Sequence, residues 1–127
     1  MIKDIEILNS AYNDRNGYTR QFNLNLLTRM NNELGANFDV YQFEHLGRFN
    51  PKLNAMESFL ISKIDQTVYF ERFEKEIKFR EFEPLHLEYS FKYSSEEIEN
   101  LAEKTGFKFI KSYTDDKNNF IDTLWQK

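Results

Sequence analysis

Apolar residues in the first third of the chain recur at steps of three and four positions, which predicts helices there. The longest such pattern predicts a helix over Tyr18–Leu34, followed by Gly35 where a left-handed C-cap is expected. Its predicted core stripe consists of Phe22, Leu26, Leu27, Met30 and Leu34. We also expect a short helix over Asp4–Tyr12 and a brief third helix over Phe38–Leu46, before Pro51 marks a break into extended structure.

From Met56 onward the period shortens and predicts strands. A polar turn around Asp65-Gln66 separates the first two strands of this region. The strands expected here are Met56–Ser62, Thr67–Phe70, Ile77–Phe79 and Leu85–Tyr93, which we expect to form one sheet.

A helix and a hairpin are expected at the end of the chain. Ser94 and Glu97 form a capping box that starts a helix, and the helix runs to about Thr105. Phe107–Thr114 and Phe120–Leu124 then form a hairpin. The predicted fold class is α+β: N-terminal helices, a mostly antiparallel sheet, then a helix and a terminal β-hairpin.

Alternation within the strand at Leu85–Tyr93 carries the clearest chemical pattern. It places His86, Glu88 and Ser90 on one face and Leu87, Tyr89 and Phe91 on the other. The carboxylate and hydroxyl on the first face suit a small ligand with two polar edges, because the carboxylate accepts a hydrogen bond and the hydroxyl donates or accepts one. The plainer reading is a strand whose polar face is only solvated.

Composition narrows the function classes. With 127 residues, the chain is expected to form a single domain over residues 1–127. The net charge of -4, with basic residues spread among acidic ones, argues against a nucleic-acid partner. The chain has no cysteine, which excludes disulfides and zinc–sulfur sites. Its start, Met1-Ile2-Lys3-Asp4, has no long apolar run, so we expect no signal peptide, no membrane partner and a cytoplasmic location.

Other polar residues have weaker chemical readings. His45, His86 and Glu88 could ligate a metal, but with two histidines and no cysteine we expect surface or hydrogen-bonded histidines and no metal site. Glu57 and Glu88 could form a carboxylate pair for glycoside hydrolysis, although among 21 acidic residues such pairs arise by chance. Tyr12 by itself reads as a helix-end tyrosine with a solvated hydroxyl.

Strings spread over nearly the whole chain carry a family resemblance. They are Ala11–Asp14, Thr19–Leu27, Asn32–Asp39, Phe43–His45, Asp65–Val68, Glu88–Tyr93, Gly106-Phe107 and Tyr113–Asp115. In this order they resemble the C-terminal part of the histidine-specific, S-adenosylmethionine-dependent methyltransferases. This family includes the histidine Nα-methyltransferase of ergothioneine synthesis.

The resemblance implies a substrate-binding role for four residues. Tyr12 stands where a family tyrosine helps to hold the amino-acid head group, and Glu88 and Ser90 stand where family members read the imidazole ring. Ser58 stands where the family has a methionine beside the ring, which leaves open whether histidine or another ring is read. We expect no catalytic side chain here, because methyl transfer to an amine needs mainly a deprotonated nitrogen in the right orientation.

The resemblance also implies a cofactor domain that precedes the matched region. In family members this domain is the doubly wound sheet of a class I methyltransferase, which binds S-adenosylmethionine. The four glycines of this chain form no G-x-G-x-x-G turn, so we expect the cofactor in the full-length enzyme and none on this chain alone. Residues 1–93 would then be a substrate-recognition region, and residues 94–127 a helix plus hairpin that completes the methyltransferase sheet.

The predicted function is therefore the substrate-recognition C-terminal part of an amino-acid Nα-methyltransferase, with L-histidine as substrate, inactive without its N-terminal half. An uncovered hairpin edge would lead the fragment to self-associate as a homo-oligomer. Two alternatives remain: a stand-alone amino-acid-binding module, and a dimerising structural domain without catalysis.

Overall fold

The computed structural model describes residues 4–127. The α-helices are α1 (Ile5–Tyr12), α2 (Tyr18–Leu34) and α3 (Ser95–Lys104), and the short 3-10 helices are η1 (Val40–Gln42) and η2 (Glu71–Phe73). The strands are β1 (Phe43–Asn50), β2 (Ala55–Ser62), β3 (Gln66–Phe70), β4 (Lys75–Phe79), β5 (Pro84–Phe91), β6 (Lys108–Thr114) and β7 (Ile121–Gln126). These strands pair antiparallel, so the predicted α+β class with antiparallel pairing is confirmed.

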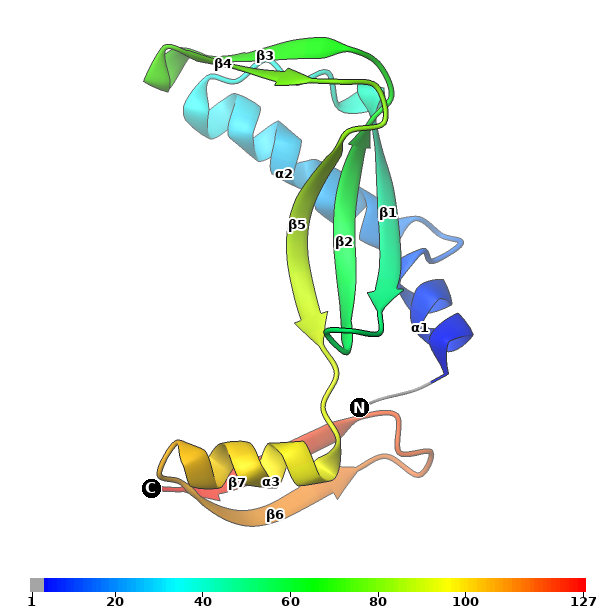
Figure 1. Ribbon diagram of the computed structural model, residues 1–127, viewed down its shortest axis with the longest axis vertical. Coiled ribbons are helices and arrows are strands. Elements are labelled where there is room, and N and C mark those ends of the chain that lie inside the picture. Colours follow the sequence, from blue (N-terminus) through cyan, green and yellow to red (C-terminus); the bar gives the residue numbers. More distant parts are fainter. Residues whose placement is uncertain (1–3) are drawn as a thin grey trace.

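The strands form three sheets. The central sheet has the order β1-β2-β5, while β3-β4 and β6-β7 are two-stranded. The expectation that β3 and β4 continue the same sheet as β2 and β5 is therefore wrong. Helix α2 lies across one face of the central sheet, and the β3-β4 hairpin crosses the end of that sheet (Figure 1). Helix α3 packs on β6 beyond the opposite end, and the C-terminus lies there (Figure 1).

The hydrophobic core lies where α2, the central sheet and the β3-β4 hairpin meet. The Phe38 ring makes edge-on contacts with Phe43 and Phe70, both at a centroid distance of 5.6 Å. Phe43 in turn meets Phe79 edge-on at 5.4 Å. Edge-to-face ring pairs contribute beyond their buried area, so these rings tie the hairpin to the central sheet. The buried cluster comprises Leu24, Leu27, Ala36, Phe38, Phe43, Leu60, Val68, Phe70 and Phe79.

Helix α2 begins and ends at the predicted residues. The Asp14 carboxylate accepts hydrogen bonds from the backbone N–H groups of Tyr18 (2.8 Å) and Thr19 (2.9 Å) at the N-terminus. These bonds, above all the one from Thr19, lower the pKa of Asp14 below its ordinary value. The ionised Asp14 carboxylate therefore stabilises the fold at pH values above its ordinary pKa. This stabilisation is lost as the pH falls through the lowered pKa. At the C-terminus Gly35 adopts φ 62 and donates its N–H to the Met30 carbonyl.

The buried face of α2 differs from the predicted stripe. Phe22 is 74% exposed and Leu26 is 37% exposed, whereas Asn23 and Leu24 are buried beside Leu27. The helix is rotated in this way because the Asn23 side chain hydrogen-bonds His45 of β1. The prediction of a core position is therefore wrong for Phe22 and Leu26.

The predicted third helix over Phe38–Leu46 is also wrong, because β1 begins at Phe43. The Asp39 carboxylate accepts from the Tyr41 N–H and supports the single turn of η1. From Phe43 onward the strand pairs with β2 over its whole length, and this pairing outweighs the local helical pattern. Pro51 accordingly lies in the turn between β1 and β2, and extended structure has already begun before it.

The remaining elements agree with the sequence-based expectations to within a few residues. The Ser94 hydroxyl accepts from the Glu97 N–H and the Glu97 carboxylate accepts from the Ser94 N–H, which confirms the capping box of α3.

Within residues 4–127, the helices fall short of the length and apolar character needed to cross a membrane. The division at residue 93 stays a prediction.

Replacing the central ring of the core tests this packing. Phe43→Ala removes a side chain that is 0% exposed, and we expect a loss of about 3–5 kcal/mol in the free energy of unfolding. Tyr41→Ala is the matched control, because Tyr41 is 84% exposed and its loss should change stability by less than about 0.5 kcal/mol. Urea unfolding measures both values, and equal effects would contradict the described core.

Candidate functional site

A β-bulge in β5 decides which side chains share a face of the central sheet. Ser58 of β2 pairs with Glu88, but the next residue, Phe59, pairs with His86, so Leu87 is the extra residue. Leu87 packs against the core cluster. His86 instead lies against Tyr89 on the opposite face, with the ring centroids 4.2 Å apart and the ring planes tilted by 40°.

The bulge corrects the predicted grouping of side chains. Glu88 and Ser90 share a face, as expected, but the placement of His86 beside them is wrong, and so is the placement of Leu87 with Tyr89. A strict alternation of period two cannot continue through an inserted residue, because the insertion shifts every later side chain to the other face.

The four predicted substrate-binding residues converge from three elements. Tyr12 ends α1, Ser58 lies in β2, and Glu88 and Ser90 lie in β5. Ser58 is buried and its hydroxyl donates to the Glu88 carboxylate at 3.3 Å. The Tyr12 hydroxyl donates to Ser90 Oγ at 2.7 Å. The structure therefore brings the four side chains together as two bonded pairs, and their role in binding stays a prediction.

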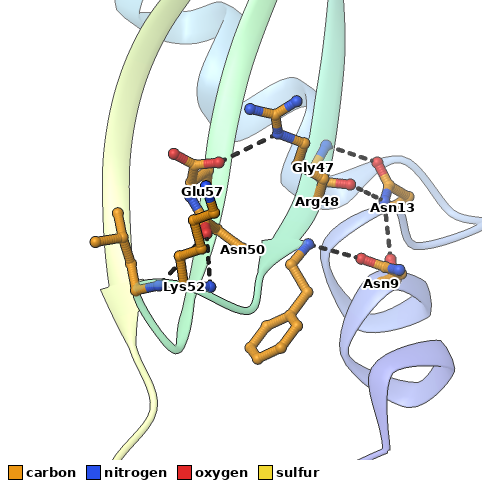
Figure 2. A network of polar contacts seen from close by, with 9 residues as sticks. Asn9, Asn13, Gly47, Arg48, Asn50, Lys52 and Glu57 are labelled. Carbon is orange, nitrogen blue, oxygen red and sulfur yellow. Dashed lines mark hydrogen bonds and ion pairs between the residues drawn. The ribbon is translucent and has the colours of Figure 1, made fainter.

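Tyr12 reaches β5 because α1 is held tightly against β1. The Asn13 side chain bonds both backbone groups of Gly47, donating to the carbonyl at 2.7 Å and accepting from the N–H at 2.9 Å (Figure 2). The Asn9 carboxamide accepts a hydrogen bond from the Phe49 N–H at 3.0 Å, two residues farther along β1. A Cβ at Gly47 would lie 2.8 Å from Tyr12 Cβ, so only glycine permits this approach.

His45, two residues before Gly47 in β1, also holds this end of α1. Asn23 Nδ2 lies 3.1 Å from His45 Nδ1, and His45 Nε2 lies 2.8 Å from the Tyr12 carbonyl oxygen. An amide nitrogen only donates and a carbonyl only accepts, so Nδ1 carries the lone pair and Nε2 the proton. Both ring nitrogens are therefore engaged, which leaves neither free for a metal.

The other chemical readings of the sequence find no matching geometry. Among residues 4–127 there is no group of three histidine, aspartate or glutamate side chains placed to hold a metal ion. Glu57 is paired with Tyr89 in the sheet register and thus lies on the face opposite Glu88. Its carboxylate bonds Arg48 Nε at 3.1 Å (Figure 2). The proposed carboxylate pair for glycoside hydrolysis is therefore wrong.

A cavity of about 200 Å³ opens between α2 and β5, with Glu88 at its edge. Phe22, Leu26 and Leu87 form apolar walls, and Asn23 and Arg29 add polar groups. Its volume suits a small planar ring, and Glu88 is the anionic acceptor at its edge. The exposed position of Phe22 is thus explained by its place in this wall.

Lys92 is a member of the site that the sequence analysis missed. Its ammonium donates to Ser90 Oγ at 2.7 Å and to the Tyr12 hydroxyl at 2.9 Å, and it lies 4.9 Å from the centroid of the Tyr12 ring. Lys92 follows Ser90 by two positions, so continued alternation beyond Glu88 and Ser90 was the signal that could have found it. We call Tyr12, Ser90 and Lys92 the hydroxyl triad.

The sequence matches one protein family over residues 1–127, described as histidine-specific, SAM-dependent methyltransferase. It is 31% identical over 120 residues to a histidine N-alpha-methyltransferase of Mycolicibacterium smegmatis and 32% identical over 120 residues to that of Mycobacterium tuberculosis. Both alignments cover 94% of this chain and 37% of the relative. Ergothioneine biosynthesis protein 1 of Schizosaccharomyces pombe is 31% identical over 112 residues, covering 85% of this chain and 14% of that protein.

Removing the bonds between α1 and β1 tests how this site is held. Asn13→Ala leaves the N–H and carbonyl of buried Gly47 without the Asn13 side chain as their partner, and we expect a loss of about 1–3 kcal/mol in unfolding free energy. Asn16→Ala, in the exposed turn that follows, is the control and should change stability by less than about 0.5 kcal/mol. Thermal or urea unfolding measures both variants. An unchanged free energy of unfolding in Asn13→Ala would show that these bonds do not hold α1.

Proposed function

Because this chain belongs to the histidine-specific, SAM-dependent methyltransferase family, we propose that it is the substrate-recognition part of an L-histidine Nα-methyltransferase. The observation that carries the proposal is the convergence of Tyr12, Ser58, Glu88 and Ser90 as two bonded pairs, of which Glu88 lines a cavity of ring size. The two mycobacterial relatives are histidine N-alpha-methyltransferases, and this chain spans 37% of their length.

In this proposal the side chains hold and orient the amino acid. Glu88 accepts the N–H of the imidazole ring, Ser90 bonds the other ring nitrogen, and Tyr12 contacts the substrate from the end of α1 toward its head group. Buried Ser58 keeps one Glu88 oxygen engaged, which limits the orientations of that carboxylate. Such positioning favours reaction because it fixes the geometry of the amine before the methyl group arrives.

The described residues do not fit S-adenosylmethionine, whose binding needs a backbone that closely approaches the ligand. Gly47 is packed against Tyr12, while Gly17 and Gly35 flank the two ends of α2. Gly106 follows the helix α3 and not a strand. We therefore propose that the cofactor binds to the part of the methyltransferase that this chain does not cover, a class I domain, and that this chain alone transfers no methyl group.

The same observation supports one second candidate, a stand-alone amino-acid-binding module. The hydroxyl triad and the cavity both lie within residues 4–127, whereas no cofactor cradle is found among these residues. Both candidates require histidine binding, and only the first requires methyl transfer once the cofactor-binding half is supplied.

Histidine affinity tests the proposed function. We expect Glu88→Ala to weaken L-histidine binding about 10- to 150-fold, since a hydrogen bond to a charged group contributes about 1.5–3 kcal/mol. Glu99→Ala, on exposed α3, removes a carboxylate away from the site and should leave the affinity unchanged. Isothermal titration at pH 8 measures both. Equal affinities of Glu88→Ala and the parent chain would reject the site.

The β6-β7 hairpin generates a further prediction. Within residues 4–127 its two strands pair only with each other, and Tyr113, Phe120 and Leu124 are each more than half exposed. An open edge with an apolar surface tends to associate, so we propose that the isolated chain forms a homo-oligomer through this hairpin. Light scattering at high protein concentration should give a mass above that of one chain, and a clean monomer would contradict the proposal.

A further inference from the structure

We propose that Lys92 makes the hydroxyl triad a hydrogen-bond donor toward the ligand, so that the site takes the neutral imidazole ring and rejects the protonated ring. This inference rests on the proposed function, in which Glu88 and Ser90 contact the same ring. It adds a specificity-determining residue and a required protonation state of the substrate.

Counting donors and acceptors gives the direction of the Ser90 hydroxyl. The Lys92 ammonium carries only donors, so both of its bonds, to Ser90 Oγ at 2.7 Å and to the Tyr12 hydroxyl at 2.9 Å, end on hydroxyl oxygens that accept. Ser90 Oγ also accepts from the Tyr12 hydroxyl at 2.7 Å. Both lone pairs of Ser90 Oγ are then filled, and the Ser90 O–H can only donate outward.

The triad offers an outward O–H whichever of the two hydroxyls, Tyr12 or Ser90, donates the hydrogen bond between them. If Ser90 donates to Tyr12 instead, the Tyr12 O–H is the proton left over, and it points outward in place of the Ser90 proton. In either arrangement the two hydroxyls hold two protons and use one between themselves. The triad therefore offers the ligand a donor, together with the third N–H of Lys92.

The neutral ring complements this arrangement, and the protonated ring does not. Neutral imidazole has one N–H, which suits the Glu88 carboxylate, and one lone pair, which suits the outward O–H of the triad. Imidazolium has two N–H groups, so one would face a donor. Its positive charge would also lie near the Lys92 ammonium, which offsets the attraction of Glu88 for a cation.

Charged and titratable groups also lie on the elements around the triad. They are His45 of β1, which bonds the Tyr12 carbonyl, Glu88 of β5, and Arg29 of α2, which lines the cavity and is paired with Glu33. A change of affinity with pH can also come from titratable groups of the protein. A ligand whose ring stays neutral separates the two sources.

The experiment measures the affinity of the 127-residue chain for two ligands between pH 7.5 and pH 5.5. One ligand is L-histidine and the other is 1,2,4-triazolyl-alanine, whose ring stays neutral throughout. The parent chain should lose about tenfold in L-histidine affinity, the fall in the neutral fraction for a ring pKa of about 6.5. Its affinity for the triazole should stay level, and Lys92→Met should reduce the loss for L-histidine to less than about threefold.

Lys111→Met is the matched control, because Lys111 also lies over a tyrosine ring, 4.6 Å from the centroid of Tyr113, but on β6. The Lys111→Met variant should show the same dependence of L-histidine affinity on pH as the parent chain. Lys92→Ala removes the same ammonium with a shorter side chain and should flatten the L-histidine profile as Lys92→Met does, so it tests the inference if Lys92→Met does not fold or bind. Circular dichroism checks folding of each variant.

The outcomes separate this inference from the proposed function. If the parent chain binds L-histidine and Lys92→Met or Lys92→Ala keeps the full pH dependence, the inference is wrong and the proposed function stands. The inference alone is also wrong if the affinity of the parent chain for L-histidine does not change with pH, or if its affinity for the triazole falls as much as that for L-histidine. If the parent chain binds neither ligand at pH 7.5, the proposed function and this inference are both wrong.

Discussion

The close contact between the end of α1 and strand β1 at Gly47 sets the position of the proposed substrate site. Asn13 engages both backbone groups of Gly47, and His45 donates to the Tyr12 carbonyl, so the last turn of α1 is fixed by polar bonds to two positions of β1. The missing side chain at Gly47 lets Tyr12 lie on the sheet, and its hydroxyl then reaches Ser90 in β5. The close approach at Gly47 thus joins the first helix of the chain to the strand that carries the proposed ligand-binding groups.

Much of the fold followed from local signals in the sequence. The capping box at Ser94 and the glycine after α2 are short-range chemistry, and both elements end where these residues predict. The failures lie where tertiary contacts decide. Strand β1 forms because β2 lies beside it, against a local helical pattern, and α2 turns Phe22 outward because Asn23 is tied to His45.

The candidate site was partly visible in the sequence for the same reason. The pairing of Glu88 with Ser90 on one face needs only their spacing beyond the bulge, and the family resemblance added Tyr12 and Ser58. The loss of His86 from that face was not predictable, because no local signal marks Leu87 as an inserted residue. Lys92 continues the alternation of Glu88 and Ser90, but its bond to Tyr12 joins residues far apart in the chain, as do the bonds of Gly47 to Asn13, and spacing along one element cannot show such bonds.

The most direct test of the account is to map L-histidine on the chain by two-dimensional NMR of its backbone amides. If these residues form the substrate-recognition part of the family's site, titration should shift the amides around Tyr12, Ser58 and Glu88–Lys92, together with those of α2 that border the cavity. The amides of β6 and β7 should stay unchanged. Saturable shifts confined to another region, or no shifts at millimolar L-histidine, would contradict the account.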